Sequence, residues 1–144
     1  MSPGGRNTRS GRIWETVIRP VLDAHYAGRY GEQVAVGLKL TGEPYLADFV
    51  VYEPSGDIIV SAKWQQTPGT AEDKILWDIA NLIAIVRQSG QYRKAYVVLG
   101  GNGFSNAMRT FLLQQGHRGV LQDGHLVEVV SLEDFLARAN QGRV

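Results

Sequence analysis

Apolar side chains recur along this chain with two spacings, about 3.6 residues for a helix and 2 residues for a strand. Residues 12–27 have the helical spacing, and Pro20 should kink or divide that helix. Alternation of apolar and polar residues then predicts three strands, over residues 33–40, 45–53 and 58–64. The turn-forming stretch Pro54-Ser55-Gly56-Asp57 separates the last two strands, which indicates an antiparallel hairpin.

The second half of the chain alternates between the two spacings. Thr70 is a typical N-cap residue with Asp73 in the capping-box position, so a helix should run from there to about Gly90. The pattern continues with a strand over residues 92–99, a helix over 105–114, a strand over 126–130 and a helix over 132–140. A pairing of Val120-Leu121 with the last strand, across Asp123-Gly124, stays open. This order of elements predicts an α/β domain in which helices flank a mixed sheet.

The predicted hairpin brings a carboxylate next to an amine. With the turn centred on Ser55-Gly56, Asp48 lies directly opposite Lys63, and their Cβ atoms are about 5 Å apart. Alternation along the two strands gives one apolar face, made of Ala47, Phe49, Val51, Ile58, Val60, Ala62 and Trp64. Asp48 and Lys63 lie on the opposite face, with Val50, Ser61 and Gln65. That face is partly apolar too, so its polar groups need partners or a chemical role.

A carboxylate and a lysine at one level of a sheet suit the hydrolysis of phosphodiesters. This reaction uses a divalent cation to polarise the phosphate and to lower the pKa of the attacking water. A hard cation such as Mg²⁺ binds carboxylate oxygens and keeps several water molecules. A neighbouring lysine can orient the water, remove its proton or stabilise the developing charge. An ordinary surface ion pair is the alternative interpretation of Asp48 and Lys63.

The placement of these residues resembles the motif of the PD-(D/E)xK nuclease superfamily. A helix is followed by three strands, a helix and a strand, with Tyr45-Leu46-Ala47-Asp48 on the second strand and Ser61-Ala62-Lys63 on the third. The resemblance covers about residues 12–100. It implies a restriction-endonuclease-like αβββαβ core, here with an additional C-terminal α-β-α segment. It also implies that Asp48 binds the metal ion, Mg²⁺ or Mn²⁺, and that Lys63 is the catalytic lysine.

Two positions depart from the motif of that family. Ala47 replaces its proline, and Ser61 stands where the second carboxylate belongs. Some members with a serine there take a glutamate from the following helix, which implies that Glu72 is the second metal ligand of the catalytic site. Complementing the positive end of the helix dipole is the alternative role of Glu72. Glu15 lies on the first helix, where many members carry an additional glutamate, and is a further catalytic and metal-binding candidate.

The length and the charge distribution of the chain predict its domain organisation. With 144 residues, the chain is long enough for one domain with a core but not for two. Residues 1–11 are basic and rich in small polar residues, so we expect a flexible arm, followed by a single domain over residues 12–144. The candidate nucleic-acid contacts are Arg6, Arg9, Arg12 and Gln65. A solvated tail is the alternative for the arm.

The sequence therefore predicts a divalent-metal-dependent DNA endonuclease. Cutting both strands with one small domain is simplest in a two-fold symmetric homodimer. The chain has no cysteine and no run of about 20 apolar residues, so we expect it in the cytoplasm, without membrane contact. Two alternatives stay open, a Holliday-junction resolvase of the same fold and a DNA-binding module that lost catalysis through Ser61.

Overall fold

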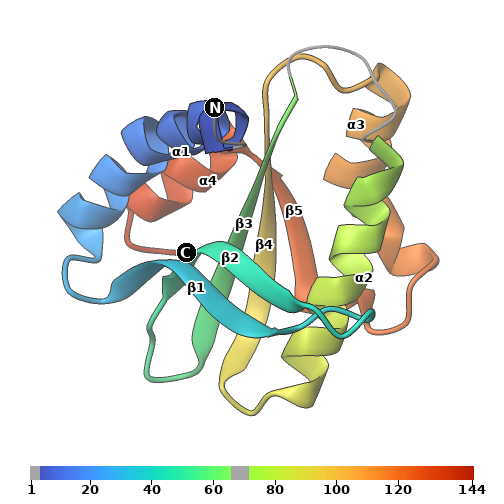
Figure 1. Cartoon of the computed structure of the whole chain (residues 1–144), viewed down its shortest axis with the longest axis horizontal. Coiled ribbons are helices and arrows are strands. Elements are labelled where there is room, and N and C mark those ends of the chain that lie inside the picture. The colour runs from blue at the N-terminus through green and yellow to red at the C-terminus, as the bar shows by residue number, and fades with distance from the viewer. Residues whose placement is uncertain (1–3, 66–71) are drawn as a thin grey trace.

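Five strands form one mixed sheet with helices on both of its faces (Figure 1). The structure, a computed structural model, describes residues 4–65 and 72–144, with side chains from Trp14 onward in the first part and from Asp73 onward in the second. The elements in chain order are α1 (Gly4–His25), β1 (Tyr30–Leu38), β2 (Pro44–Val51), β3 (Asp57–Trp64), α2 (Glu72–Gln88), β4 (Tyr92–Gly100), α3 (Asn106–Leu113), the 3-10 helices η1 (Gly116–Gly119) and η2 (Gly124–Leu126), β5 (Val127–Ser131) and α4 (Leu132–Asn140).

The strands lie in the sheet in their sequence order, β1-β2-β3-β4-β5. β1, β2 and β3 are antiparallel neighbours, whereas β4 runs parallel to β3, and β5 runs parallel to β4. Parallel neighbours need a crossover connection, and α2 and α3 supply the two crossovers on one face of the sheet. α1 and α4 cover the opposite face (Figure 1). The predicted restriction-endonuclease-like architecture, a mixed sheet flanked by helices, is confirmed.

Each face of the sheet has its own apolar core. Under α1 and α4, the helical stripe Trp14, Ile18 and Leu22 packs with Phe49 and Phe135. On the other face, α2 buries Ile75, Ile79, Leu82, Ile83 and Val86 against the sheet. Complete burial of one such side chain contributes about 1.5–3 kcal/mol, so these two stripes fix how both helices lie on the sheet.

Two helical predictions differ from the structure. α1 begins at Gly4 instead of residue 12, and it continues through Pro20 as one helix. Pro20 is exposed, and Ile18 and Leu22 hold the helix on the sheet on either side of it. The predicted N-cap Thr70 lies outside the described residues. No helix in the described part of the chain is long and apolar enough to cross a membrane.

The pairing of Val120-Leu121 with the last strand does not occur, because β5 pairs with β4 and the preceding segment forms 3-10 helices. His117 explains this local structure. Its ring is fully buried, and Nε2 lies 3.0 Å from the carbonyl oxygen of Gly124 and 2.7 Å from that of Val127. These contacts hold the segment against the end of β5 in place of a strand pairing.

The predicted pairing of Asp48 with Lys63 is wrong, because the hairpin register is shifted by two residues. The observed pairs are Phe49 with Val60, Val50 with Ile59 and Val51 with Ile58. The turn closes through a hydrogen bond from Gly56 N to Glu53 O (3.1 Å), so Pro54 and Ser55 are its central residues. Pro is favoured at the first central position of such a turn. A shift by an even number keeps each side chain on its face but changes the residue opposite it.

Candidate active site

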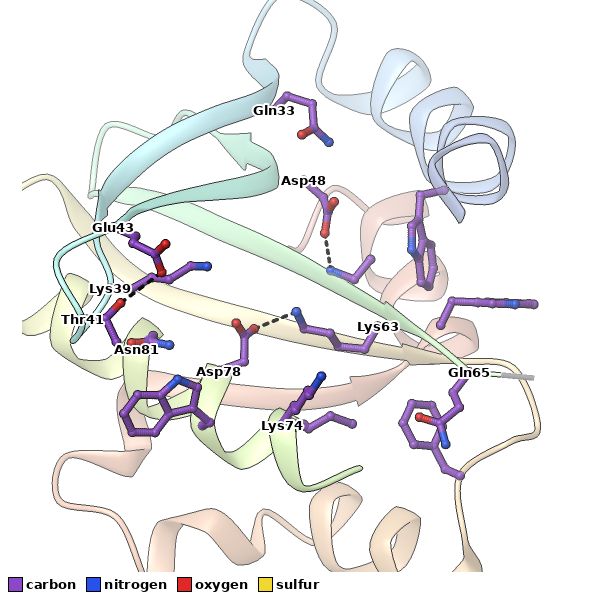
Figure 2. Close-up of a pocket in the computed structure, with 16 residues that line it drawn as sticks. Gln33, Lys39, Thr41, Glu43, Asp48, Lys63, Gln65, Lys74, Asp78 and Asn81 are labelled. Carbon is purple, nitrogen blue, oxygen red and sulfur yellow. Dashed lines mark hydrogen bonds and ion pairs between the residues drawn. The ribbon is translucent and has the colours of Figure 1, made fainter. Parts of the chain in front are cut away.

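An open pocket of about 780 Å³ lies between β2, β3, the β1–β2 turn and α2 (Figure 2). Its polar lining includes Lys39 and Glu43 from the turn region, Asp48 from β2, Lys63 from β3, and Lys74 and Asp78 from α2. Oxygen and nitrogen groups of both charges therefore face one space, which is the usual arrangement of an active site.

Asp48 occupies a point where β2 is irregular. Between β1 and β2, Glu32 pairs with Phe49 and Val34 pairs with Ala47, but Gln33 and Asp48 between them do not pair. Gln33 has a φ of +51°, which is unusual within a strand. Phe49 packs in the core under α1, whereas Ala47 packs in the core under α2. The assignment of Ala47 to the same face as Phe49 is therefore wrong, because the strand twists over between them.

The carboxylate of Asp48 takes the place of a ladder bond between β2 and β3. Pairing of these strands ends at Phe49 and Val60, and the next N–H toward the end of β3, on Ala62, donates to Asp48 Oδ2 at 2.7 Å. The strands thus separate at Asp48, which opens the pocket (Figure 2). A strand residue whose side chain bonds the neighbouring backbone has a fixed position, which suits a metal ligand.

The surroundings of Asp48 raise the pKa of its carboxyl group. Burial is the largest cause, and the nearby charge of Asp78 adds to it. The Ala62 N–H and the charge of Lys63 act in the opposite direction without cancelling it. The ionised form of Asp48 is therefore disfavoured in this pocket, and a cation beside it would stabilise that form.

Lys63 pairs with an acidic residue that was not predicted as a site residue. Its Nζ lies 2.8 Å from Oδ2 of Asp78 on α2, and both side chains are half-buried (Figure 2). Tyr45 donates its hydroxyl to the same oxygen at 2.6 Å and lies 2.9 Å from the Ser61 Oγ, itself 3.5 Å from that oxygen. Burial, followed by the charge of Asp78, raises the pKa of Tyr45, so its hydroxyl stays protonated and remains a donor.

The two faces of α2 explain why Asp78 reaches the pocket. The apolar stripe that contains Ile75 and Ile79 faces the sheet, and the pocket-lining residues Lys74, Trp77, Asp78 and Asn81 follow one another at spacings of three, one and three along its flank. That second stripe is visible in the sequence as three polar residues and Trp77, which border the apolar stripe. Which of its members meets Lys63 depends on how the helix lies on the sheet.

The other predicted site residues lie in different places. Gln65 lines the pocket, and its Nε2 donates to the carbonyl oxygen of Gly103 at 3.2 Å. Glu15 is exposed on α1, lies 3.7 Å from Arg19 and does not line the pocket. Glu72 is the first residue of α2, but its side chain lies outside the described part of the structure. The same holds for the side chains of Arg6, Arg9 and Arg12, whose backbone belongs to α1.

The donor groups suit a hard divalent cation. The carboxylates of Asp48 and Asp78 both line the pocket, and the Ser61 hydroxyl lies buried behind it, 3.5 Å from Asp78 Oδ2. Among the described side chains, no group of three or more acidic, histidine or cysteine residues could hold a metal ion. Mg²⁺ commonly binds through one or two carboxylates and completes its shell with water and substrate phosphate, so two acids fit this ion.

Comparison with known proteins identifies a family whose model matches this chain. The model of the PD-(D/E)XK nuclease superfamily domain matches residues 6–143. No curated protein matches the chain. Among solved structures, the chain is similar to the small subunit of the heterodimeric restriction endonuclease R.BspD6I, with a TM-score of 0.47 and 14% identity, over 89% of this chain and 66% of that one. It is also similar to Pyrococcus furiosus SfsA in complex with Ca²⁺, with a TM-score of 0.44 and 19% identity, over 86% of this chain and 56% of that one. The chain thus spans less than two thirds of either structure.

Proposed function

Because the chain belongs to the PD-(D/E)XK nuclease superfamily, we propose that it is a divalent-metal-dependent DNA endonuclease whose active site is the pocket around Asp48, Lys63 and Asp78. The observation that carries this proposal is the 2.8 Å contact of Lys63 with Asp78 in the pocket that Asp48 also lines. This arrangement supplies the two carboxylates and the lysine that the family motif requires, although Ser61 occupies one carboxylate position.

The metal site that we propose uses Asp48 and Asp78, with Mg²⁺ or Mn²⁺ as the ion. Bound there, the ion would polarise the phosphate and lower the pKa of the attacking water. Asp78 takes the role that the sequence assigned to Glu72, and Glu72 remains a second candidate because it lies on the same helix. Glu15 is the weaker candidate, since it is exposed and lies outside the pocket lining.

Lys63 has two roles in this proposal. Without substrate it neutralises Asp78 at 2.8 Å, so the two half-buried groups do not face each other unpaired. With substrate bound, its amine orients the attacking water or stabilises the negative charge that develops on the phosphate. Asp48 and the Ala62 N–H hold the opposite wall of the pocket at a fixed position.

Two further parts of the proposal concern the assembly and its setting. A homodimer related by two-fold symmetry would present two such pockets to the two strands of DNA. The arginines at positions 6, 9 and 12 would contact phosphates from the first turns of α1, which passes the pocket at Trp14. A chain without cysteine suits the reducing cytoplasm, where we place this activity.

The test is cleavage of supercoiled plasmid, linear duplex and four-way junction DNA, with and without Mg²⁺ or Mn²⁺. We expect metal-dependent nicking by the parent protein and a loss of roughly 100-fold or more in Asp48→Asn, Lys63→Gln and Asp78→Asn. Asp123→Asn is the matched control, because Asp123 forms a surface pair with Arg87 at 3.0 Å outside this pocket. Circular dichroism establishes that each variant is folded.

The dependence of the rate on metal concentration distinguishes the acids. The variant that removes a metal ligand, Asp78→Asn or Glu72→Gln, should need more Mg²⁺ for its half-maximal rate. Binding of DNA without cleavage by the parent protein, at any concentration of either metal, would reject the endonuclease and leave a DNA-binding module. Cleavage of four-way junctions in preference to duplex would instead identify a resolvase.

A further inference from the structure

One aromatic side chain of the pocket has no partner in the core. Trp77 is 53% exposed and lines the pocket from α2. The other two tryptophans pack together, since Trp14 is 4% exposed and meets Trp64 edge to face at 5.7 Å between ring centroids. Trp77 therefore keeps a large apolar ring at the pocket wall, where the fold itself does not use it.

Trp77 lies between cationic and catalytic groups. On α2 it comes three residues after Lys74 and directly before Asp78, and all three residues line the pocket. Lys39 lines the same pocket from the turn that follows β1. Lys39 and Lys74 form no ion pair within the described residues, whereas Lys63 is engaged by Asp78. The ring is thus accompanied by two amines that remain available to phosphate groups.

The β1–β2 turn, which forms the pocket wall next to Trp77, is hydrogen-bonded to α2. Asn81 is 1% exposed, follows Trp77 by one helical turn and accepts a hydrogen bond from the backbone N–H of Leu40 at 2.8 Å. The turn itself closes through Lys39 N to Glu43 O at 2.7 Å and Gly42 N to Lys39 O at 2.8 Å. The backbone at Lys39 is therefore fixed relative to the part of α2 that carries Trp77, as a binding site for one chemical group requires.

We propose that Trp77 stacks on an unpaired nucleobase of the substrate, so that the enzyme acts on DNA with unstacked nucleotides next to the cleaved bond. This inference rests on the proposed function and adds its substrate class. Within an intact duplex, away from its ends, both faces of each base are covered by neighbouring bases, and only an unstacked base offers a face to Trp77. Aromatic rings beside lysines are the usual means by which proteins hold single strands. The volume of about 780 Å³ is sufficient for a group of nucleotide size.

Binding without cleavage tests this proposal. Fluorescence anisotropy is measured with labelled oligothymidylate and with a duplex of the same length, in Ca²⁺ and in EDTA. Cleavage of plasmid, single-stranded and four-way junction DNA in Mg²⁺ is recorded separately. The variants are Trp77→Ala, Trp77→Phe and the matched control Tyr52→Ala. Tyr52 is also an exposed aromatic residue, at 39%, but it lies outside the pocket lining.

We expect Trp77→Ala to weaken single-strand binding roughly 5- to 150-fold, the loss of one stacked base, and to leave duplex binding nearly unchanged. Trp77→Phe keeps a ring and should bind within a few-fold of the parent, as should Tyr52→Ala. Parental single-strand affinity in Trp77→Ala, or an equal loss for single strand and duplex, overturns the inference. Failure of the parent to cleave plasmid, single-stranded and four-way junction DNA in Mg²⁺, while single-strand binding still depends on Trp77, rejects the endonuclease and retains the nucleobase site.

Discussion

Replacement of Tyr45 by phenylalanine tests the hydrogen-bond network beneath the proposed active site. Tyr45 is 4% exposed, and its ring packs in the core under α2, so Tyr45→Phe removes one oxygen and leaves the packing intact. The lost groups are a donor to Asp78 Oδ2 at 2.6 Å and a contact with Ser61 Oγ at 2.9 Å. Asp78 keeps Lys63 at 2.8 Å, so its charge is still paired.

The magnitude follows from the kind of hydrogen bond that is lost. A hydrogen bond to a charged group contributes about 1.5–3 kcal/mol to stability, and the acceptor here is the carboxyl group that pairs with Lys63. For a chain of 144 residues, about 3–4 °C of melting temperature corresponds to 1 kcal/mol. Tyr45→Phe should therefore unfold roughly 5–12 °C below the parent protein.

Thermal unfolding at neutral pH, followed by circular dichroism, measures this difference. Tyr92→Phe is the matched control, because Tyr92 is 8% exposed and its hydroxyl makes no hydrogen bond within the described residues. An equal loss of stability in both variants would refute the role given to the Tyr45 hydroxyl. If the proposed metal site is correct, Tyr45→Phe should also need more Mg²⁺ for its half-maximal rate, whereas Tyr92→Phe should not.

Two further predictions concern other parts of the chain. Burial lowers the pKa of His117, and its Nδ1 has no hydrogen-bond partner within the described residues. The folded state thus favours the neutral ring, and the free energy of unfolding should fall as the pH drops below about 6.5, by at most about 1.4 kcal/mol per pH unit. Urea unfolding against pH measures this, and an identical profile in His117→Gln would contradict it. Replacing Arg6, Arg9 and Arg12 together by alanine should flatten the log-log salt dependence of DNA affinity by roughly 2–3, whereas an unchanged slope would identify a passive segment.

Most of the architecture can be predicted from the sequence because it follows from local patterns. The alternation over β2 and β3 and the helical stripe of α2 repeat over several residues, so one irregular position does not alter the prediction. The face of Lys63 follows from the same alternation, and a two-residue shift in register leaves it unchanged. The chemistry that we propose for Asp48 and Lys63 could likewise be predicted from the sequence, because both residues match the family motif.

Other features depend on contacts between segments that are distant in the chain. The turn centred on Pro54 and Ser55, one position earlier than predicted, moves the hairpin register by two residues and separates Asp48 from Lys63. The irregularity opposite Gln33 then directs Asp48 to the Ala62 N–H.

The partner of Lys63 also depends on contacts between distant segments. Helical spacing defines the flank of α2 that carries several polar residues, but the choice of Asp78 depends on where Ile75 and Ile79 anchor the helix on the sheet. The periodicity of a single element determines which side its residues face. The height at which they meet a residue of another element is set by packing, and only the tertiary structure provides it.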